Sequence, residues 1–399
     1  MKEMKVSILG FGMMGVIRGL AYRGVSGYYK NTPIQPVLGD AYCLEAEAAG
    51  AKGHGWNASS DMQAVIKNPE TRYIDVCLPN ALHHDAAIAA FEAGKHVFCE
   101  KPLSANLAEG KEMAEVADKY PNLLNSCNFI YRRCPANVYA RKLAQSGKFG
   151  KLLEARMYYH QGWGGPDTPG SWRFERAHGG GAAGDLGSHS LDMLYYVTGQ
   201  RPIELCAMQT THIKQRWYPT TAGSDHGLRN SGGKADNAGK ELRAVDVDDA
   251  MRVMFTLKDG AIGTLSVTRN AQGSENQNGY ELFFEKGSIK FCFDELNYLN
   301  VYDASTDDAA TQGWSKICCN RGMYRYFSFA GGHMDGYRDL TVNGIYENML
   351  AIEALESGAA YESESPIATF RDAYNVQRTL AACDKSIAER CWVKLEDIQ

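Results

Sequence analysis

The sequence predicts two domains of different fold class, an α/β domain with a doubly wound parallel sheet over residues 1–131 and an α+β domain over residues 132–399. Short apolar strands alternate with amphipathic helices in the first third of the chain. Longer strands with alternating polar and apolar side chains follow. A chain of 399 residues is also long for one hydrophobic core, so that two cores are expected.

The N-terminal part contains a series of candidate strands with helices between them. The strands are Lys5–Gly10, Pro36–Asp40, Tyr73–Leu78, His96–Glu100 and Leu123–Asn128. Candidate helices at Leu82–Ala93 and Leu107–Tyr120 separate the last three strands, and Gly94 ends the first of these helices. Repeated strand–helix–strand units of this length predict a parallel sheet with helices on both faces.

The C-terminal part has longer candidate strands, with side chains that alternate in polarity. They are Leu152–Gln161, Met251–Leu257, Ala261–Asn270, Tyr280–Glu285 and Ser288–Phe293. An Asp-Gly pair at residue 259 joins two of them, which is a strong hairpin signal. We expect a large, mainly antiparallel sheet, one face of which is covered by helices near Leu191–Val197, Ile345–Glu356 and Ala368–Ala388.

A polar, glycine-rich insertion at residues 212–245 interrupts this pattern and has no clear periodicity. Loops of this length are uncommon in compact domains and are usually functional or disordered. Two interpretations stay open, a flap over the active site or an interface, and a mobile surface insertion.

The composition is that of a globular protein, and the charge balance leads us to expect a small soluble molecule as its partner. Hydrophobic residues make up 44% and charged residues 22%, and the net charge is -5. This charge balance provides no basic surface for nucleic acid or an anionic membrane, and no apolar stretch is long enough for a transmembrane helix. Eleven cysteines without a C-x-x-C pair favour reduced thiols in a cytoplasmic protein.

A G-x-G-x-x-G motif lies between the first candidate strand and the helix that follows it. Its residues are Gly10, Phe11, Gly12, Met13, Met14 and Gly15. Gly10 permits the tight turn, Gly12 leaves room for a pyrophosphate, and Gly15 lets the helix pack closely on the strand. The free N–H groups at the start of the helix can bind phosphates. In this position the motif predicts a Rossmann domain rather than an ordinary glycine turn.

Asp40 ends the second candidate strand, 25 residues after Gly15. A carboxylate at this place accepts hydrogen bonds from the adenosine ribose hydroxyls and repels a 2′-phosphate. The residues that follow, Ala41 and Tyr42, provide no arginine for such a phosphate. The sequence therefore favours NAD over NADP, and a helix cap is the alternative role of Asp40.

Further motifs are shared with one enzyme family. They are PNALHHDAAIAAFEAGKHVFCEKP at 79–102, Trp172-Arg173, the glycines 179–181 and GDLGSHSLDML at 184–194. With the glycine motif, they make the whole chain resemble the Gfo/Idh/MocA family of glucose–fructose oxidoreductases and inositol dehydrogenases. This resemblance implies a nicotinamide-dependent dehydrogenase that acts on CH–OH groups, and homodimers or homotetramers formed through the C-terminal sheet. The sequence also provides too few helices to cover one face of the C-terminal sheet, and an uncovered apolar face leads to the same expectation of an oligomer.

The resemblance implies that Lys101, Asp185 and His189 form the catalytic group. Asp185 and His189 are four residues apart and share one face if their segment is helical. An imidazole can take the proton of a hydroxyl near neutral pH, and an ammonium can stabilise the oxygen. The residues alone leave open whether His189 or Lys101 is the base, and the family favours His189. Taken singly, each residue also has a structural alternative, and no further ligands at suitable spacing suggest a metal.

The resemblance also assigns residues around the cofactor. Pro79, Asn80 and His83 would line its path, Glu100 and Pro102 would fix the loop around Lys101 with a cis Lys101–Pro102 bond, and Trp172 and Arg173 would reach the nicotinamide. The candidates for contact with the substrate are Lys101, Tyr159, Trp163, Asp185, His189, Tyr280 and His333. For any single aromatic candidate a core position is the alternative, because the chain has 22 tyrosines.

The leading functional hypothesis is NAD-dependent oxidation of a ring hydroxyl of a sugar, glycoside or cyclitol. An inositol dehydrogenase proper is the alternative that ranks directly behind this hypothesis. A redox-neutral enzyme that keeps NAD bound and cleaves glycosides by transient oxidation and elimination is a second enzymatic class. A dinucleotide-binding sensor without turnover is the non-enzymatic alternative.

Overall fold

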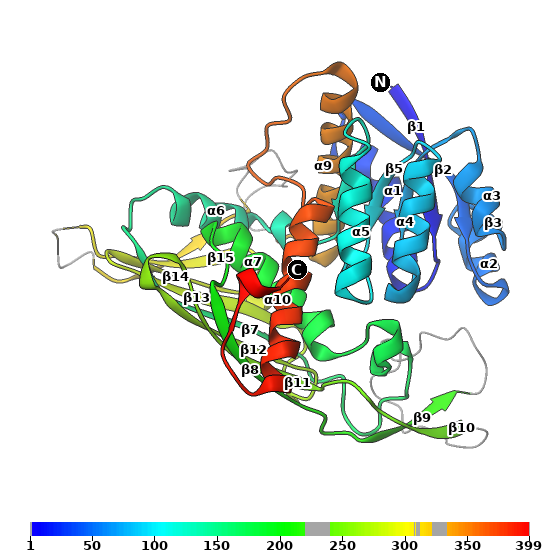
Figure 1. Cartoon of the computed structure of the whole chain (residues 1–399). Helices are drawn as coiled ribbons and strands as arrows, with labels where there is room; N and C mark the ends of the chain where they lie inside the picture. The colour runs from blue at the N-terminus through cyan, green and yellow to red at the C-terminus, as the bar shows by residue number, and fades with distance from the viewer. Residues whose placement is uncertain (1, 220–239, 307, 309–311, 321–332, 399) are drawn as a thin grey trace.

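The computed structural model describes residues 2–219, 240–306, 308, 312–320 and 333–398. An α/β unit built from the N-terminal residues lies beside a broad, curved sheet, and helices fill the space between the two (Figure 1). Within the described ranges, no helix combines the length and the apolar character that crossing a membrane requires.

The N-terminal sheet has the order β3-β2-β1-β4-β5-β6 among the described residues, and all its neighbouring strands are parallel. This is the order of the doubly wound dinucleotide-binding fold, as the sequence predicts. The strands are β1 (Lys2–Leu9), β2 (Ile34–Tyr42), β3 (Asn57–Ser59), β4 (Thr71–Val76), β5 (His96–Cys99) and β6 (Asn125–Cys127).

Helices pack on both faces of this sheet, and the predicted periodicity accounts for them. In α4 the residues Ala86, Ala87, Ala90 and Phe91 are fully buried along one side. Asn106 caps α5 by accepting a hydrogen bond from the N–H of Glu109. The helices of this domain are α1 (Met13–Tyr28), α2 (Glu45–Gly53), α3 (Met62–Lys67), α4 (His83–Glu92) and α5 (Leu107–Asp118).

The second sheet has the order β16-β15-β14-β13-β7-β12-β11-β8-β17 in the described part of the chain. It is antiparallel except between β7 and β12, in agreement with the mainly antiparallel sheet that was predicted. The Asp-Gly hairpin is also confirmed, since Asp259 and Gly260 both have positive φ. The strands are β7 (Leu152–His160), β8 (Glu204–Thr210), β11 (Ala250–Thr256), β12 (Ile262–Thr268), β13 (Gln277–Phe284), β14 (Gly287–Cys292), β15 (Tyr298–Asp303), β16 (Trp314–Cys318) and β17 (Val393–Lys394).

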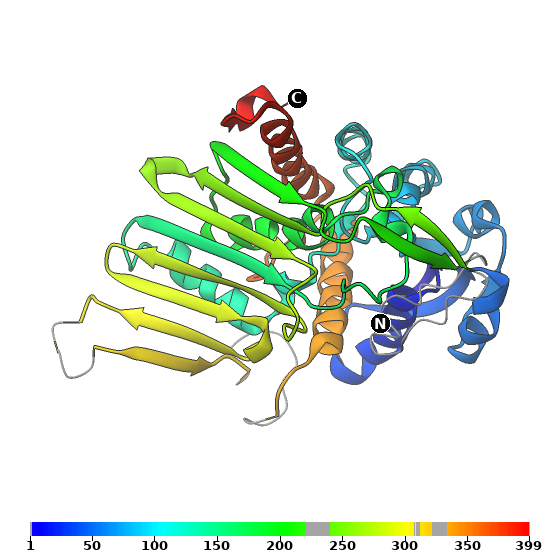
Figure 2. The same ribbon diagram turned by 90° about the horizontal axis from the view of Figure 1, so that it is seen from below.

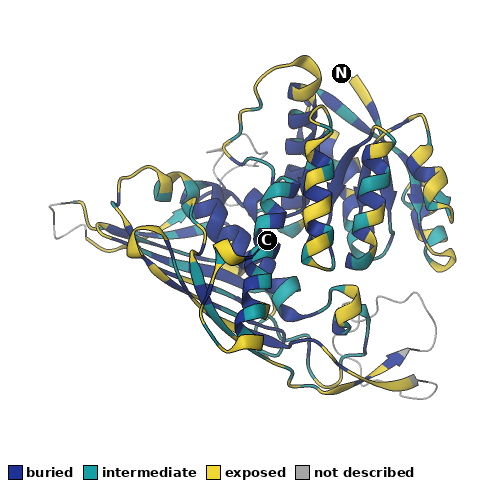
Figure 3. Cartoon of the chain, viewed as in Figure 1, coloured by how far each residue is buried: buried dark blue, intermediate teal, exposed yellow. Residues whose placement is uncertain are grey.

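One face of this sheet is covered by α6 (Pro135–Gln145), α7 (Ser188–Thr198) and α10 (Phe370–Glu389), as Figure 2 shows from below. Helix α7 is almost wholly buried between the sheet and its neighbours. The side of the strands turned away from the helices carries many exposed and half-buried residues (Figure 3).

Helix α9 (Tyr337–Ser357) corrects one prediction. The segment Ile345–Glu356 was expected to cover the C-terminal sheet, but α9 packs against α1 and contributes Ile345, Met349 and Ile352 to the core of the first domain. Its polar side chains also bond to that domain, since Tyr29 donates a hydrogen bond to Asn343. The pattern predicted a helix but could not say which apolar surface it would cover.

The boundary between the two domains, expected at residue 131, stays a prediction.

Part of the insertion at 212–245 is regular structure, which the sequence analysis did not predict. β9 (Gln215–Pro219) pairs with β10 (Lys240–Ala244) in an antiparallel hairpin. Arg216 fixes this hairpin by donating hydrogen bonds to the carbonyl oxygens of Gly164, Gly165 and Thr168. Residues 220–239 of the insertion lie outside the described residues, so that both interpretations of the insertion, a flap and a surface loop, stay predictions.

A buried ion cluster connects α1 to the end of the parallel sheet. The guanidinium of Arg18 is fully buried, donates to Glu100 at 2.8 Å, lies 3.4 Å from Asp75 and stacks on the ring of Phe98. Burial lowers the pKa of Arg18, but the charges of Asp75 and Glu100 raise it by more, so that it stays charged.

We expect Arg18→Met to lower the free energy of unfolding of the first domain by about 3–5 kcal/mol, because it leaves two buried carboxylates without their cation. Urea denaturation followed by circular dichroism measures this change. Arg23→Met removes an exposed arginine from the same helix and should change the stability by about 0.5 kcal/mol or less. Equal losses in the two variants would contradict a role for the buried charge.

Candidate active site

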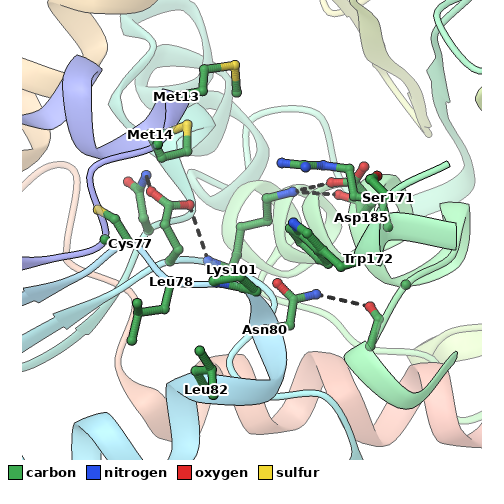
Figure 4. A pocket seen from close by; sticks show the side chains of 18 of the residues that line it. Met13, Met14, Cys77, Leu78, Asn80, Leu82, Lys101, Ser171, Trp172 and Asp185 are labelled. Atoms are coloured by element: carbon green, nitrogen blue, oxygen red, sulfur yellow. Dashed lines mark hydrogen bonds and ion pairs between the residues drawn. The ribbon is translucent and has the colours of Figure 1, made fainter. Parts of the chain in front are cut away.

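A single cavity of about 680 Å³ runs from the glycine motif to the first turns of α7. The first domain contributes the segments 10–14, 77–80 and 100–101, and the second contributes 171–173, Asp185 and His189. Figure 4 shows Met13 and Met14 at one side and Lys101, Trp172 and Asp185 facing each other across it. The cavity is therefore formed between the two domains.

The glycine turn fits a dinucleotide. Gly10 has φ 94°, and a Cβ there would lie 2.6 Å from the carbonyl oxygen of Cys77. A Cβ at Gly15 would lie 2.2 Å from the carbonyl oxygen of Gly10. Helix α1 begins directly after Gly12, and no side chain caps its free N–H groups. Phosphate oxygens are the acceptors that such a helix start binds well.

The loop around Lys101 is held by Glu100 and His83. Glu100 accepts hydrogen bonds from Arg18 and from Asn128, each at 2.8 Å. The Lys101–Pro102 peptide bond is cis, as the resemblance implied. Both ring nitrogens of His83 face backbone carbonyl oxygens, those of Pro102 at 3.0 Å and of Leu78 at 2.8 Å.

Lys101 and Asp185 meet across the cavity. The Nζ of Lys101 donates to the Oδ1 of Asp185 at 2.7 Å and to its carbonyl oxygen at 2.9 Å, while Arg269 donates to Oδ2 at 3.2 Å. Burial raises the pKa of Asp185, but Lys101, Arg269 and Arg173 hold it well below its usual range. Asp185 is therefore a permanent anion that fixes an ammonium group at the cavity wall.

His189 lies on the same wall, in an aromatic setting. A π-helical turn at Ala183–Gly187 precedes α7, and both Asp185 and His189 line the cavity. The ring of His189 packs edge-on against Tyr131, with centroids 4.8 Å apart, and Nδ1 is buried without a hydrogen-bond partner among the described residues. Burial and the charge of Lys101 lower the pKa of His189 well below its usual value, so that the ring is neutral.

A chain of polar side chains lines the remaining wall. The hydroxyl groups of Tyr131 and Tyr159 are 2.7 Å apart, and Tyr159 donates to Asn276 at 2.6 Å. The Nε1 of Trp163 donates to Gln161 at 2.7 Å. Tyr159 and Trp163 thus line the cavity, and their contact with a substrate stays a prediction.

The cavity is also lined by Pro79, Asn80, Glu100, Trp172 and Arg173, and their contact with the cofactor stays a prediction. Asn80 donates to the carbonyl oxygen of Gly179 at 3.0 Å, which ties the two domains together. The guanidinium of Arg173 stacks over the ring of Trp172.

Five predicted site residues are not among those that line the cavity. Gly15 packs instead against the turn at Gly10. Tyr280 is 1% exposed and donates to Asn137 in the core, and His333 is exposed and is not among the lining residues. His83 is fully buried and fixes the Lys101 loop instead of lining the path. Asp40 is engaged by Asn57 and Asn68, because β2 continues two residues beyond it to Tyr42.

Sequence analysis missed several residues that line the cavity. They are Tyr42, Glu47, Asn128, Tyr131, Gln161, Tyr218, Arg269, Asn276 and Tyr337. Arg269 follows directly after β12, and Gln161 directly after β7. Polar residues at the ends of strands were therefore the sequence feature that could have identified them. Among the described residues, no group of three or more His, Cys, Asp or Glu side chains is arranged to hold a metal ion.

A Rossmann domain whose phosphate-binding turn opens into a cavity completed by a second domain defines a dinucleotide-dependent oxidoreductase. Residues 4–126 match the family model described as oxidoreductase family, NAD-binding Rossmann fold, and residues 138–290 match the GFO/IDH/MocA C-terminal domain. The chain belongs to the Gfo/Idh/MocA family of oxidoreductases, and its cofactor is NAD.

Its relatives include dehydrogenases of known structure. The levoglucosan dehydrogenase of Pseudarthrobacter phenanthrenivorans is 34% identical over 406 residues, which cover all of both chains. The oxidoreductase domain protein from Kribbella flavida has a TM-score of 0.87 at 32% identity, over 99% of this chain and 100% of that one. Levoglucosan dehydrogenase in complex with NADH and L-sorbose has a TM-score of 0.85 at 30% identity, over 99% of each chain.

We expect His189 to stay neutral at about pH 6, where an ordinary histidine is largely protonated. Nitrogen chemical shifts of histidine-labelled protein measure this, and His189→Asn identifies the resonance. His84 is an internal control. Partial burial lowers its pKa, but hydrogen bonds to Asp85 and Glu112 raise it overall. Protonation of His189 at the same pH as His84 would contradict the buried, cation-facing environment.

Proposed function

We propose that this protein is an NAD-dependent dehydrogenase that oxidises a secondary ring hydroxyl of a compact sugar or cyclitol. The observation that carries the proposal is the convergence of Lys101, Asp185 and His189 on one cavity that also contains the glycine turn. These groups come from different domains, and a purely structural role would not require them to face a common space.

The roles follow from the charge states. Bound NAD would serve as the hydride acceptor, and the glycine turn with the start of α1 would hold its phosphate groups. The neutral imidazole of His189 takes the hydroxyl proton, because its depressed pKa leaves it unprotonated and ready to act as a base. The ammonium of Lys101 donates a hydrogen bond to the reacting oxygen and stabilises the charge that develops there. Asp185 keeps Lys101 in position.

The polar wall supports a sugar-like substrate. Tyr131, Tyr159, Gln161 and Asn276 supply donors and acceptors for several hydroxyl groups, and Trp163 provides an aromatic face for a C–H surface. The relative that acts on levoglucosan makes an anhydrohexose the first substrate to test. Inositols and simple glycosides are the next candidates.

We expect His189→Asn to lower kcat about 10²–10⁴-fold and Lys101→Met about 10²–10³-fold, with smaller effects on NADH affinity. Steady-state formation of NADH with levoglucosan, inositols and glucosides measures both. His84→Asn and Lys111→Met are the matched controls, and both should retain the activity. Full activity in His189→Asn would refute its role as the base.

The stoichiometry separates this proposal from the redox-neutral alternative. A dehydrogenase forms one NADH for each substrate consumed, whereas an enzyme that cleaves glycosides by transient oxidation regenerates its NAD. We expect equal amounts of NADH, followed by absorbance, and oxidised product, followed by chromatography. Cleaved glycoside without accumulation of NADH would favour the alternative.

We further propose that the uncovered face of the C-terminal sheet joins copies of the chain into a homodimer or homotetramer. Met208, Met254 and Ile262 lie on neighbouring strands, face the same side and are 54–68% exposed. An exposed apolar patch of this kind is typical of an interface.

We expect Met208→Glu combined with Met254→Glu to shift the oligomer to monomer, because two carboxylates would be buried at the interface. Sedimentation velocity measures the change. Leu20→Glu, at an exposed leucine on α1, should leave the mass unchanged. A wild-type monomer would contradict the interface.

A further inference from the structure

We propose that Arg269 is a positioning residue of the active site, which holds Asp185 through its second carboxylate oxygen and leaves a net positive charge at the place where Lys101 meets the substrate. This inference deepens the proposed function and rests on it, since it assumes that Lys101 binds the reacting oxygen. Arg269 was not among the residues that the sequence motifs predicted.

The backbone of Arg269 is fixed at the end of a central strand. The residue follows directly after β12, and its N–H donates to the carbonyl oxygen of Asp249 at 3.0 Å. Its own carbonyl oxygen accepts from the N–H of Gly164 at 2.8 Å. A Cβ on Gly164 would lie 2.7 Å from the Cβ of Arg269, so that this loop packs directly on the arginine. The side chain therefore starts from a fixed point beside the cavity.

The guanidinium holds the segment that carries Asp185. Its Nη1 donates to the carbonyl oxygen of Arg173 at 3.0 Å, and its Nη2 donates to that of Gly181 at 2.7 Å and to the Oδ2 of Asp185 at 3.2 Å. The same two carbonyl oxygens accept hydrogen bonds that close the segment on itself, from the N–H of Gly181 and the N–H of Asp185. A planar guanidinium can reach several such acceptors at once, which an ammonium group cannot. Arg269 thus fixes both the backbone and the carboxylate of Asp185.

The charge of Arg269 acts inside the protein. The residue is fully buried, and its guanidinium carbon lies 5.2 Å from the ring centroid of Trp163 and 5.5 Å from that of Phe174. Charges interact more strongly in such surroundings than in water, because less solvent screens them. The pairing of Arg269 with Asp185 therefore affects every charge that shares this wall of the cavity.

The three groups in contact carry one positive charge together. Lys101 and Asp185 alone would form a neutral pair, which offers little stabilisation to an oxygen that becomes negative during hydride loss. Figure 4 shows the two side chains facing each other, and the Nζ of Lys101 lies 2.7 Å from Oδ1. Because Arg269 binds Oδ2, the anion is shared between two cations. Part of the charge of Lys101 is thus left for the substrate.

Two further charged groups lie near this cluster, and their charges have opposite signs. Arg173 adds a cation, which stacks over the ring of Trp172. Asp248 adds a carboxylate, whose Oδ2 accepts from the N–H of Ala183 at 2.9 Å. Burial raises the pKa of Asp248, and the charge of Arg269 reduces this rise. The sign of the cluster therefore remains that of the three groups in contact.

The ring of His189 responds to the same cluster. Burial and then the charge of Lys101 lower its pKa, whereas the charge of Asp185 raises it. The other described side chains packed on the ring are aromatic and uncharged near neutral pH, namely those of Phe129, Tyr131 and Tyr159. Loss of Arg269 leaves the charge of Asp185 less balanced, so that the pKa of His189 rises.

Arg216 provides a matched control. It is a second fully buried arginine that donates to carbonyl oxygens, and its guanidinium carbon lies 4.0 Å from the ring centroid of Phe174. Its ion pair is with Asp249 and not with Asp185. Arg216→Gln therefore removes an equivalent buried charge that does not touch the catalytic group. Arg269→Gln removes the charge at the site, and Arg269→Lys keeps it.

The first measurement is the pKa of His189, from nitrogen chemical shifts of the histidine-labelled full-length protein over a series of pH values. We expect Arg269→Gln to raise this pKa by about half a unit or more, and Arg269→Lys and Arg216→Gln to change it by less than about 0.3 unit. Thermal melting verifies folding, and Arg269→Met is the second neutral variant. An unchanged pKa in the neutral variants, or an equal rise in Arg216→Gln, would overturn the inference.

The second measurement separates positioning from a merely structural role. We expect Arg269→Gln to lower kcat about tenfold or more and to change the dissociation constant of NADH less than about twofold, and Arg269→Lys to recover most of the lost activity. A loss of NADH affinity as large as the loss of kcat, or no recovery with lysine, would show that Arg269 only maintains the fold of the loop and would overturn the inference.

The two measurements also distinguish this inference from the proposed function. A wild-type protein that oxidises none of the tested sugars would refute the proposed function, and the pKa of His189 would still test the effect of Arg269. Undiminished oxidation of a sugar by Arg269→Gln would overturn the inference and leave the proposed function intact.

Discussion

The ion pair between Lys101 and Asp185 joins the two domains at the wall of the cavity, where both side chains are partly buried. Lys101 extends from the end of the parallel sheet, and Asp185 from the turn before α7. Arg269 binds the second carboxylate oxygen from the strand side, so that the anion is held by two cations. Burial raises the pKa of Asp185, but these cations hold it well below its usual range. Burial, and then the charge of Lys101, lowers the pKa of His189 and keeps its ring neutral.

The sequence was sufficient for the fold class, because the fold class rests on local patterns. The catalytic roles of Lys101, Asp185 and His189 came from the family resemblance and stay a proposal. The glycine motif, the apolar periodicity of α4 and the Asp-Gly hairpin depend on neighbouring residues, and the structure has them as expected. The predictions that failed concern properties that depend on strand register or on contacts with residues far away in the sequence. Asp40 was chosen because it was expected to end the second strand, 25 residues after Gly15, but only the pairing of β1 with β2 reveals that the strand continues to Tyr42.

Burial explains the remaining differences. Tyr280 is a polar aromatic residue on a sheet strand, but its hydroxyl is satisfied by Asn137 inside the core, and no sequence pattern distinguishes this from a ligand contact. Arg269 was overlooked because a fully buried arginine is rare, and its carbonyl partners at Arg173 and Gly181 come from a distant loop. Helix α9 has a clear apolar face, and only tertiary structure assigns it to the first domain.

The dual attachment of α9 has a consequence for substrate selection. Its first residue, Tyr337, lines the cavity, while the body of the helix is packed into the core of the nucleotide-binding domain. Tyr337 also packs edge-on against Phe293 of the second domain, so that a large rotation of one domain against the other would have to break this contact or the packing of the helix. We therefore expect the width of the cleft to be set before any sugar arrives, so that the enzyme selects by preformed shape instead of by closing around its ligand.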